Sequence, residues 1–441
     1  RKLPVMTSKI RILLKIICFL IVFFAISGIL AFFLKDDSNS YARVLRHEFH
    51  NQQKIDFLFS GASHTSHGIN PQIADKVFNK SVFNLGTPAQ QMDGTCVLLK
   101  QAVKLYKIEK VFLELDFNIA TSFSIQNRHG FTASYIVLDF LKDPELKYDF
   151  MLNMSRPEYY LNTLLPIGKD KFMDLNPKKV AAKFKSVVSG KYFKYEYNDK
   201  KSFYAGKGCV LDTDFFENGS IYTTEKEDPI KLAEISDTWK NSVAEIIRIC
   251  QQNDIELVLY SMPVTDFYLN AKGNYDEYFD FVRHFAAQYG YDYFDFNLCK
   301  ENFLNLEDKD FSDDNHLNMS GVQKFTESFC KFFTGKISRE DAFYQSYSEK
   351  MKNQKKRIFG LQLITAEDHK SLEIIPLSNN VSPEEITYDV CAVFDGNTEI
   401  LGERTSESTV VFPKSGFGQL MIKSYVNGVQ NNEVVSSYIA F

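Results

Sequence analysis

The chain has 441 residues, 44% of them hydrophobic, so it can bury a large core and hold more than one domain. Its formal net charge of -5 gives no support for a nucleic-acid partner, because surfaces that bind nucleic acid are strongly basic. The seven cysteines are scattered without a Cys-x-x-Cys pair or a metal-type spacing, so we expect buried thiols rather than a metal centre.

An unbroken apolar run covers Ile16–Leu34 and has about the length that a bilayer-spanning helix requires. Basic residues precede it, and Asp36 and Asp37 follow it. The positive-inside rule then predicts a cytoplasmic segment at 1–15, a membrane anchor at 16–35 and an extracytoplasmic body after a stalk at 36–54. A cleaved signal peptide begins similarly, but no small-x-small cleavage site follows the run. We therefore expect a single-pass protein of the cell membrane.

Five apolar, strand-like runs alternate with helical patterns between residues 55 and 335. Such alternation predicts a parallel sheet with helices on both faces, which is a three-layer α/β/α fold. The predicted strands are Ile55–Ser60, Ser81–Leu85, Lys110–Leu115, Ile255–Ser261 and Tyr291–Phe296. The predicted helices are Asn70–Phe78, Gln90–Tyr106, Ile230–Gln252, Tyr275–Tyr289 and Gly321–Phe333.

Two further regions lie outside this alternation. An insertion at 119–219 separates the third and fourth strands, and it is compatible either with a lid over a site or with a structural elaboration. After a charged linker at 336–356, residues 357–441 show short alternating runs separated by turn residues. This pattern predicts a small all-β domain resembling a sandwich.

The segment Asp313-Asp314-Asn315-His316 supplies an Asp-x-x-His pair on one loop. A catalytic serine needs a base, and the base needs an acid that orients it. Ser63, in a small-residue turn directly after the first strand, is the predicted nucleophile, with His316 as base and Asp313 as orienting acid. All three follow predicted strands, so they belong at the carboxyl edge of the sheet, where sites of such folds lie.

A serine nucleophile also needs hydrogen-bond donors for the oxyanion. The backbone amides of Ser63 and Gly86 are candidates, and a side-chain amide should complete the set. Topology favours Asn118, with Gln90 and Gln91 as alternatives.

Three other residues compete for these roles. Asp314 is a second candidate for the orienting acid, and His64 and His67 are rivals for the base. The two histidines also admit a metal site, although two histidines in one loop carry little weight and we expect no metal.

These motifs resemble the SGNH, or GDSL-like, hydrolase superfamily over residues 55–333. Within that superfamily they are similar to the membrane-anchored bacterial branch, which includes the D-alanine-transfer protein of teichoic-acid modification and exopolysaccharide O-acetyltransferases. The blocks GASH, NLGTPAQ and DDNH match the family's nucleophile, oxyanion-glycine and base motifs, at Ser63, Gly86 and the pair Asp313 and His316. The third block departs, since Asp116-Phe117-Asn118 stands where the family has Gly-x-Asn-Asp.

The resemblance implies an SGNH, flavodoxin-like fold and an extracytoplasmic serine esterase or O-acyltransferase that needs no cofactor. It implies acylated cell-envelope polysaccharide as substrate, and a membrane-bound acyltransferase as a partner that delivers the acyl group. The alternative is a non-catalytic glycan-binding or scaffold protein that retains the fold.

Overall fold

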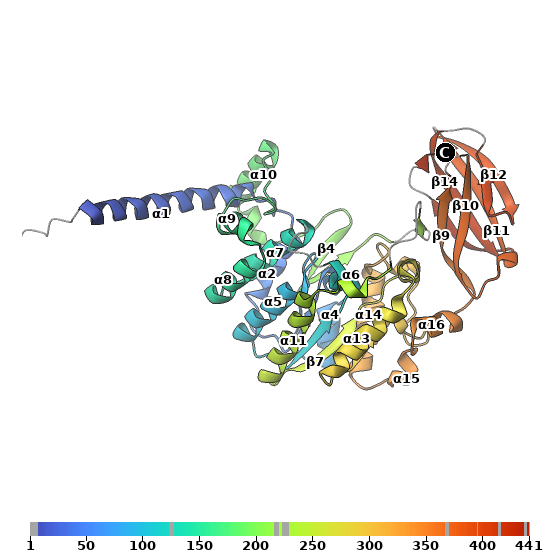
Figure 1. Cartoon of the computed structure of the whole chain (residues 1–441), viewed down its shortest axis with the longest axis horizontal. Coiled ribbons are helices and arrows are strands. Elements are labelled where there is room, and N and C mark those ends of the chain that lie inside the picture. Colours follow the sequence, from blue (N-terminus) through green and yellow to red (C-terminus); the bar gives the residue numbers. More distant parts are fainter. Residues whose placement is uncertain are drawn as a thin grey trace, which may run out of the picture.

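The computed structural model describes residues 8–122, 128–215, 220–222, 229–366, 370–394, 396–412, 416–435 and 439–440. It contains, in chain order, a long apolar helix, a mixed α/β body and a C-terminal all-β region (Figure 1). The apolar helix, α1 (Ser8–Leu34), includes the run predicted to cross a membrane. Within the described residues, it is the one helix long and apolar enough to do so.

The body is built on a parallel sheet of five strands in the order β2-β1-β3-β7-β8. Each strand lies inside the run predicted for it, so the predicted parallel sheet is confirmed. Because the chain direction across the sheet reverses after β2, the switch point of this order lies between β1 and β3, where ligands of such sheets bind. The strands are β1 (Phe57–Ser60), β2 (Val82–Asn84), β3 (Lys110–Glu114), β7 (Glu256–Ser261) and β8 (Tyr293–Asp295).

Helices cover both faces of this sheet. On one face, α4 (Pro71–Phe78) pairs with α14 (Met319–Phe333). On the other, α5 (Met92–Leu105) packs against α11 (Asp237–Gln252), which contacts α13 (Tyr275–Gln288). Right-handed crossovers account for this division, because the chain moves outward from β1 to β2 through α4 and back to β3 through α5.

The core between the sheet and α14 is aromatic. Phe59 of β1 stacks on Phe112 of β3 with ring centroids 4.5 Å apart, and Phe329 of α14 contacts both rings. All three side chains are fully buried. The high phenylalanine content of the chain is thus used here for core packing, where large apolar rings bury the most surface.

The first part of the predicted insertion is helical. Helices α7 (Arg128–Phe140) and α8 (Pro144–Asn153) contact α5 of the body. Two more, α9 (Tyr160–Leu164) and α10 (Pro177–Val188), lie beside the body-proximal end of α1 (Figure 1).

The second part of the insertion returns to the sheet as an antiparallel hairpin of β4 (Ser202–Gly206) and β5 (Cys209–Asp212). The turn of this hairpin contains Gly208, where a Cβ would lie 1.7 Å from the Asn84 carbonyl oxygen at the end of β2. Only glycine permits that approach, and it brings the start of β5 next to the end of β2 at the carboxyl edge of the sheet.

After the short helices α15 (Arg339–Ala342) and α16 (Tyr347–Asn353), the chain forms two further sheets with a hydrophobic core of their own. One has the order β13-β10-β9-β6, and the other has the order β12-β11-β14-β15, with β16 paired to β14. Their strands are β9 (Arg357–Thr365), β10 (Ser371–Asn379), β11 (Ile386–Phe394), β12 (Asn397–Thr405), β13 (Thr409–Val411), β14 (Phe417–Val426), β15 (Val429–Val435) and β16 (Ile439–Ala440).

Two strands of this region were not predicted. β12 is polar and exposed along most of its length, so it lacks the alternation that marks a half-buried strand. β6 (Ser220–Tyr222) follows directly after the insertion and pairs in parallel with β9. A three-residue strand carries no periodic signal, and nothing in the sequence connects residues 220–222 with the C-terminal region.

Candidate active site

Ser63 lies at the first position of α3 (Ser63–Ser66), directly after β1. The end of β2 packs closely against this turn, because a Cβ on Gly86 would lie 2.4 Å from the Ala62 carbonyl oxygen. Glycine at this position therefore lets two neighbouring strand ends approach one another. The strand-to-helix turn holds the Ser63 hydroxyl at the carboxyl edge of the sheet.

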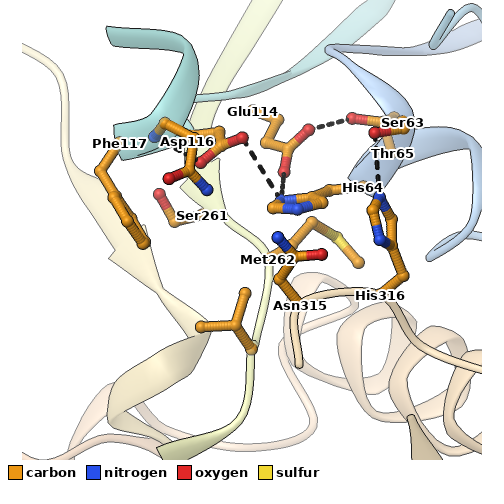
Figure 2. A network of polar contacts seen from close by, with 12 residues as sticks. Ser63, His64, Thr65, Glu114, Asp116, Phe117, Ser261, Met262, Asn315 and His316 are labelled. Atoms are coloured by element: carbon orange, nitrogen blue, oxygen red, sulfur yellow. Dashed lines mark hydrogen bonds and ion pairs between the residues drawn. The ribbon is translucent and has the colours of Figure 1, made fainter. Parts of the chain in front are cut away.

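The structure brings together the three residues predicted as nucleophile, base and orienting acid, and Figure 2 shows Ser63 and His316 facing one another. Nε2 of His316 lies 3.0 Å from Oγ of Ser63, and Nδ1 lies 2.9 Å from the nearer carboxylate oxygen of Asp313. A carboxylate accepts hydrogen bonds only, so Nδ1–H of His316 donates to it. Nε2 then accepts from the Ser63 hydroxyl, which is the arrangement of a serine, a general base and its orienting acid.

The loop carrying Asp313 and His316 is fixed by its own backbone. The backbone amides of Asn315 and His316 donate to Asp313 at 2.9 and 2.7 Å, which closes a turn around that carboxylate. From outside the loop, the hydroxyl and amide of Thr265 donate to the Asp314 carbonyl oxygen at 2.7 and 3.1 Å. The Asp-x-x-His spacing therefore does two things. It lets the Asp313 carboxylate close a turn with the backbone amides, and it places the same carboxylate beside the His316 ring.

The protonation states suit a base and its orienting acid. Burial works against ionised Asp313, but the hydrogen bond and charge of His316 and the backbone amides of Asn315 and His316 together outweigh it and lower the pKa of Asp313 to about 2. Burial lowers the pKa of His316, and the charge of nearby His64 lowers it further, although Asp313 opposes both effects. His316 is consequently neutral near neutral pH and able to accept a proton.

A second polar cluster lies beneath these residues and was not predicted. Nδ1 of His64 lies 3.4 Å from Glu114 and 3.5 Å from Asp116, and Thr65 donates its hydroxyl hydrogen bond to Glu114 (Figure 2). All four side chains are buried. The imidazole ring of His64 packs edge-on against that of His316, with centroids 4.8 Å apart.

The raised pKa of His64 makes this imidazole the protonated histidine of the cluster. Burial disfavours protonation of His64, but the carboxylates of Asp116 and Glu114 outweigh that cost and raise the pKa of His64 to about 9. Burial and the neighbouring Glu114 raise the pKa of Asp116, while His64 opposes them. Glu114 is a charged residue at the end of an otherwise apolar strand. This was the feature of the sequence that could have indicated its role, because charged groups in buried strands are paired or functional.

The insertion supplies another contact. Asp212, at the end of β5, lies 2.8 Å from Nδ1 of His67, and Ser312 donates to the same carboxylate oxygen at 3.2 Å. The His67 ring contacts that of His316 with centroids 5.5 Å apart. The two rival bases are thus both held by carboxylates, whereas His316 faces Ser63. Across the described ranges, no cluster of three or more His, Cys, Asp or Glu residues is suited to a metal ion.

The structure does not bring the predicted oxyanion donors together. The Gly86 amide donates to Oδ1 of Asn84 at 3.1 Å, so the close approach to Ala62 explains this glycine instead. The Asn118 side chain accepts from Tyr268 at 2.8 Å and also bonds Asp116.

The two glutamine alternatives are directed elsewhere as well. Gln90 accepts from Thr87 at 2.8 Å and donates to Thr95 at 2.9 Å, while Gln91 donates to Ala89. Of the predicted donors, the Ser63 amide remains, since the first amides of a helix have no acceptor inside it.

Comparison with known proteins gives structural similarity at low sequence identity. No protein-family model matches the chain, and no curated protein matches it. A solved structure from Streptococcus pneumonia, provisionally described as a platelet activating factor, is similar with 13% identity and a TM-score of 0.31. The similarity covers 67% of this chain and 92% of that one.

Proposed function

We propose that this protein is a serine esterase or O-acyltransferase of the SGNH type, with Ser63 as nucleophile, His316 as general base and Asp313 as orienting acid. One observation carries the proposal: a histidine neutral near pH 7 lies between a strand-end serine, at 3.0 Å, and a carboxylate, at 2.9 Å. This arrangement activates a serine hydroxyl toward an acyl carbon. The sequence motifs around the three residues agree with it.

The reaction proceeds in two steps. Oγ of Ser63 attacks the ester carbonyl carbon while its proton passes to Nε2 of His316, and the leaving alcohol departs with that proton. The acyl group is then bonded to Ser63. A water molecule or a sugar hydroxyl gives its proton to Nε2 of His316 and attacks the acyl carbon. The ester bond to Ser63 then breaks, and His316 returns the proton to Oγ of Ser63. Hydrolysis and transfer differ only in this acceptor.

The ionised Asp313 keeps the proton of His316 on Nδ1 through both steps and stabilises the imidazolium that forms between them. The amide of Ser63, at the start of α3, is a donor available to the oxyanion.

The substrate class and location belong to the same proposal. We place the body outside the cell on a single membrane anchor, because basic residues precede α1 and acidic ones follow it. An esterase or acyltransferase there meets acylated cell-envelope glycans. A membrane-bound acyltransferase that supplies the acyl group is the partner that transfer would require.

The test is covalent labelling of the full chain in detergent with a fluorophosphonate, read by intact mass. One adduct is expected on the wild type and none on Ser63→Ala or His316→Ala. Ser66→Ala is the matched control, because Ser66 belongs to the same turn and has no contact with His316 among the described hydrogen bonds. It should label like the wild type.

Full cellular function in both Ser63→Ala and His316→Ala, with folded protein, would contradict the proposal. The non-catalytic glycan-binding alternative would then stand, and binding of acylated glycan to the two variants would test it directly.

A further inference from the structure

The insertion presents exposed apolar side chains on the elements that surround the outer end of α1. We propose that this surface, here called the insertion surface, lies on the lipid bilayer and binds anionic headgroups. The idea rests on α1 crossing the membrane and is independent of the chemistry at Ser63. The insertion surface consists of the apolar residues Leu161, Leu164, Ile167, Phe172, Leu175, Phe184, Val188 and Phe193 together with the exposed lysines Lys169, Lys178, Lys185, Lys191 and Lys194.

Direct contacts attach the insertion surface to the end of α1. The backbone amide of Asp36 donates to the Phe172 carbonyl at 2.7 Å, and that of Asp174 donates to the Leu34 carbonyl at 2.8 Å. The ring of Phe33, in the last turn of α1, contacts that of Phe184 on α10 with centroids 5.6 Å apart. These residues therefore lie at the same depth as the end of α1.

The charged residues on either side of the apolar run show where the end of α1 lies relative to the bilayer. Lys15 is the last charged residue before the apolar run, and Lys35 is the first after it. About 20 helical residues cross the hydrocarbon layer, so the outer boundary falls near Leu34 and Lys35. This is the level at which residues 172–174 and α10 contact α1. A membrane spanned by α1 consequently reaches the insertion surface.

The exposed apolar side chains and the high lysine content of the insertion surface also favour contact with a bilayer. Phe184 and Val188 are one turn apart on α10 and are 56% and 71% exposed, and Leu161 and Leu175 are 73% and 76% exposed. Residues 160–195 contain eight lysines and two aspartates, although the whole chain is acidic. Aromatic and aliphatic residues mixed with lysines are typical of segments that lie in the membrane interface.

Figure 1 shows α9 and α10 beside the outer end of α1, so the insertion flanks the anchor rather than the far side of the body. A bilayer is therefore favoured over a soluble partner, which would have to compete with lipid for this position. Contact at the insertion surface would add a second attachment to the single anchor and hold the body in one orientation above the membrane.

The test uses the full chain, reconstituted at one copy per lipid nanodisc. The background carries Cys18→Ser and Cys391→Ser, which removes the cysteines that are not buried. A polarity-sensitive fluorophore is attached at Val188→Cys or, as control, at Ile400→Cys. Ile400 is 68% exposed and Val188 is 71% exposed, but Ile400 lies in the C-terminal β region of the same membrane-anchored chain.

Lipids with a nitroxide high on the acyl chain are the quencher. The label at position 188 should be quenched at least about threefold more than that at position 400, since interfacial segments reach about 5–10 Å into the headgroup boundary. Equal quenching at the two positions would overturn the proposal. So would quenching that occurs only in discs holding two copies, because a second copy would then be the occupant. Unchanged melting temperatures would show that the labelled variants fold.

A second arm tests the choice of lipid. Discs of phosphatidylcholine are compared with discs that also contain phosphatidylglycerol, for the labelled chain and for its Lys185→Gln, Lys191→Gln, Lys194→Gln variant. These three lysines are exposed. Anionic lipid should increase quenching at position 188, and the triple variant should lose most of that increase. No dependence on either change would overturn the anionic part of the proposal.

Discussion

Two polar sites meet at the carboxyl edge of the sheet, and they differ in almost every respect. Asp313 and His316 belong to a surface loop, and the Asp313 side chain is 53% exposed. His64, Glu114 and Asp116 lie beneath that loop, and the His64 side chain is 6% exposed. The two histidines touch, yet the pKa of His316 is lowered whereas that of His64 is raised to about 9.

The different surroundings of the two imidazoles explain why one is protonated and its neighbour is neutral. His64 has two carboxylates at the end of β3 and holds a proton, whereas His316 has one carboxylate and a positive neighbour. Pairs of groups whose surroundings separate their pKa values are typical of sites that perform acid–base chemistry. Burial is the main cause of the lowered pKa of His316, and we infer that the buried cluster adds to it, so the two sites act together although only the exposed one contacts Ser63.

Breaking the exposed site should have the largest effect. Asp313→Asn removes the carboxylate that accepts from Nδ1 of His316 and favours the wrong tautomer. We expect a loss of about 10³ to 10⁴ in kcat/KM on a chromogenic acyl ester. The neighbouring variant Asp314→Asn is the matched control, because Thr265 binds the backbone carbonyl of Asp314, which the substitution keeps. It should retain most of the activity.

An equal loss in both variants, with unchanged melting temperature, would mean that the loop conformation matters rather than the Asp313 carboxylate. Retained activity in Asp313→Asn would remove Asp313 from the proposed mechanism.

The two sites also differ in how far sequence could predict them. Ser63, Asp313 and His316 could be found because each follows a recognisable strand or stands in a short polar motif, and parallel-sheet topology brings such positions together. Glu114 could not be placed in the same way, since one charged residue in a strand does not show which face it occupies or what it contacts. Asp212 arrives from a hairpin inside the insertion, and its pairing with His67 depends on tertiary packing alone.

The contacts of the predicted oxyanion donors, and some strands, also depend on tertiary packing that the sequence does not show. Sequence placed Gly86 at the edge of the sheet but could not show that Asn84 accepts from its amide. It placed all five strands of the parallel sheet, because each is apolar and bounded by turn residues. It missed the hairpin of β4 and β5 inside the insertion and the strands β6 and β12, which are short or exposed and carry no periodic signal.

The coupling between the two sites should appear in the pH profile. His316 acts when neutral, so kcat/KM falls in acid as this residue is protonated, and its lowered pKa places that fall below pH 6.5. His64→Gln removes a positive neighbour and leaves two carboxylates, which should raise the pKa of His316 and move the acid limb up by about one pH unit. His67→Gln is the comparison, since its charge has a smaller effect on His316, and it should move the limb less. An unmoved limb in His64→Gln, with kcat alone reduced, would leave His64 a purely structural role.

The smallest effect we expect is on stability, and its sign follows from His64. Its pKa is raised from 6.5 to about 9 on folding, so its protonation stabilises the folded protein fully below pH 6.5. That contribution, at most about 3 kcal/mol, is lost as pH rises through 9. The melting temperature of the wild type in detergent should therefore exceed that of His64→Gln by a few degrees at pH 6, and the gap should shrink by pH 9.5. A gap that does not change with pH would mean that His64 contributes packing rather than charge, and the opposite protonation states of the two histidines would lose their support.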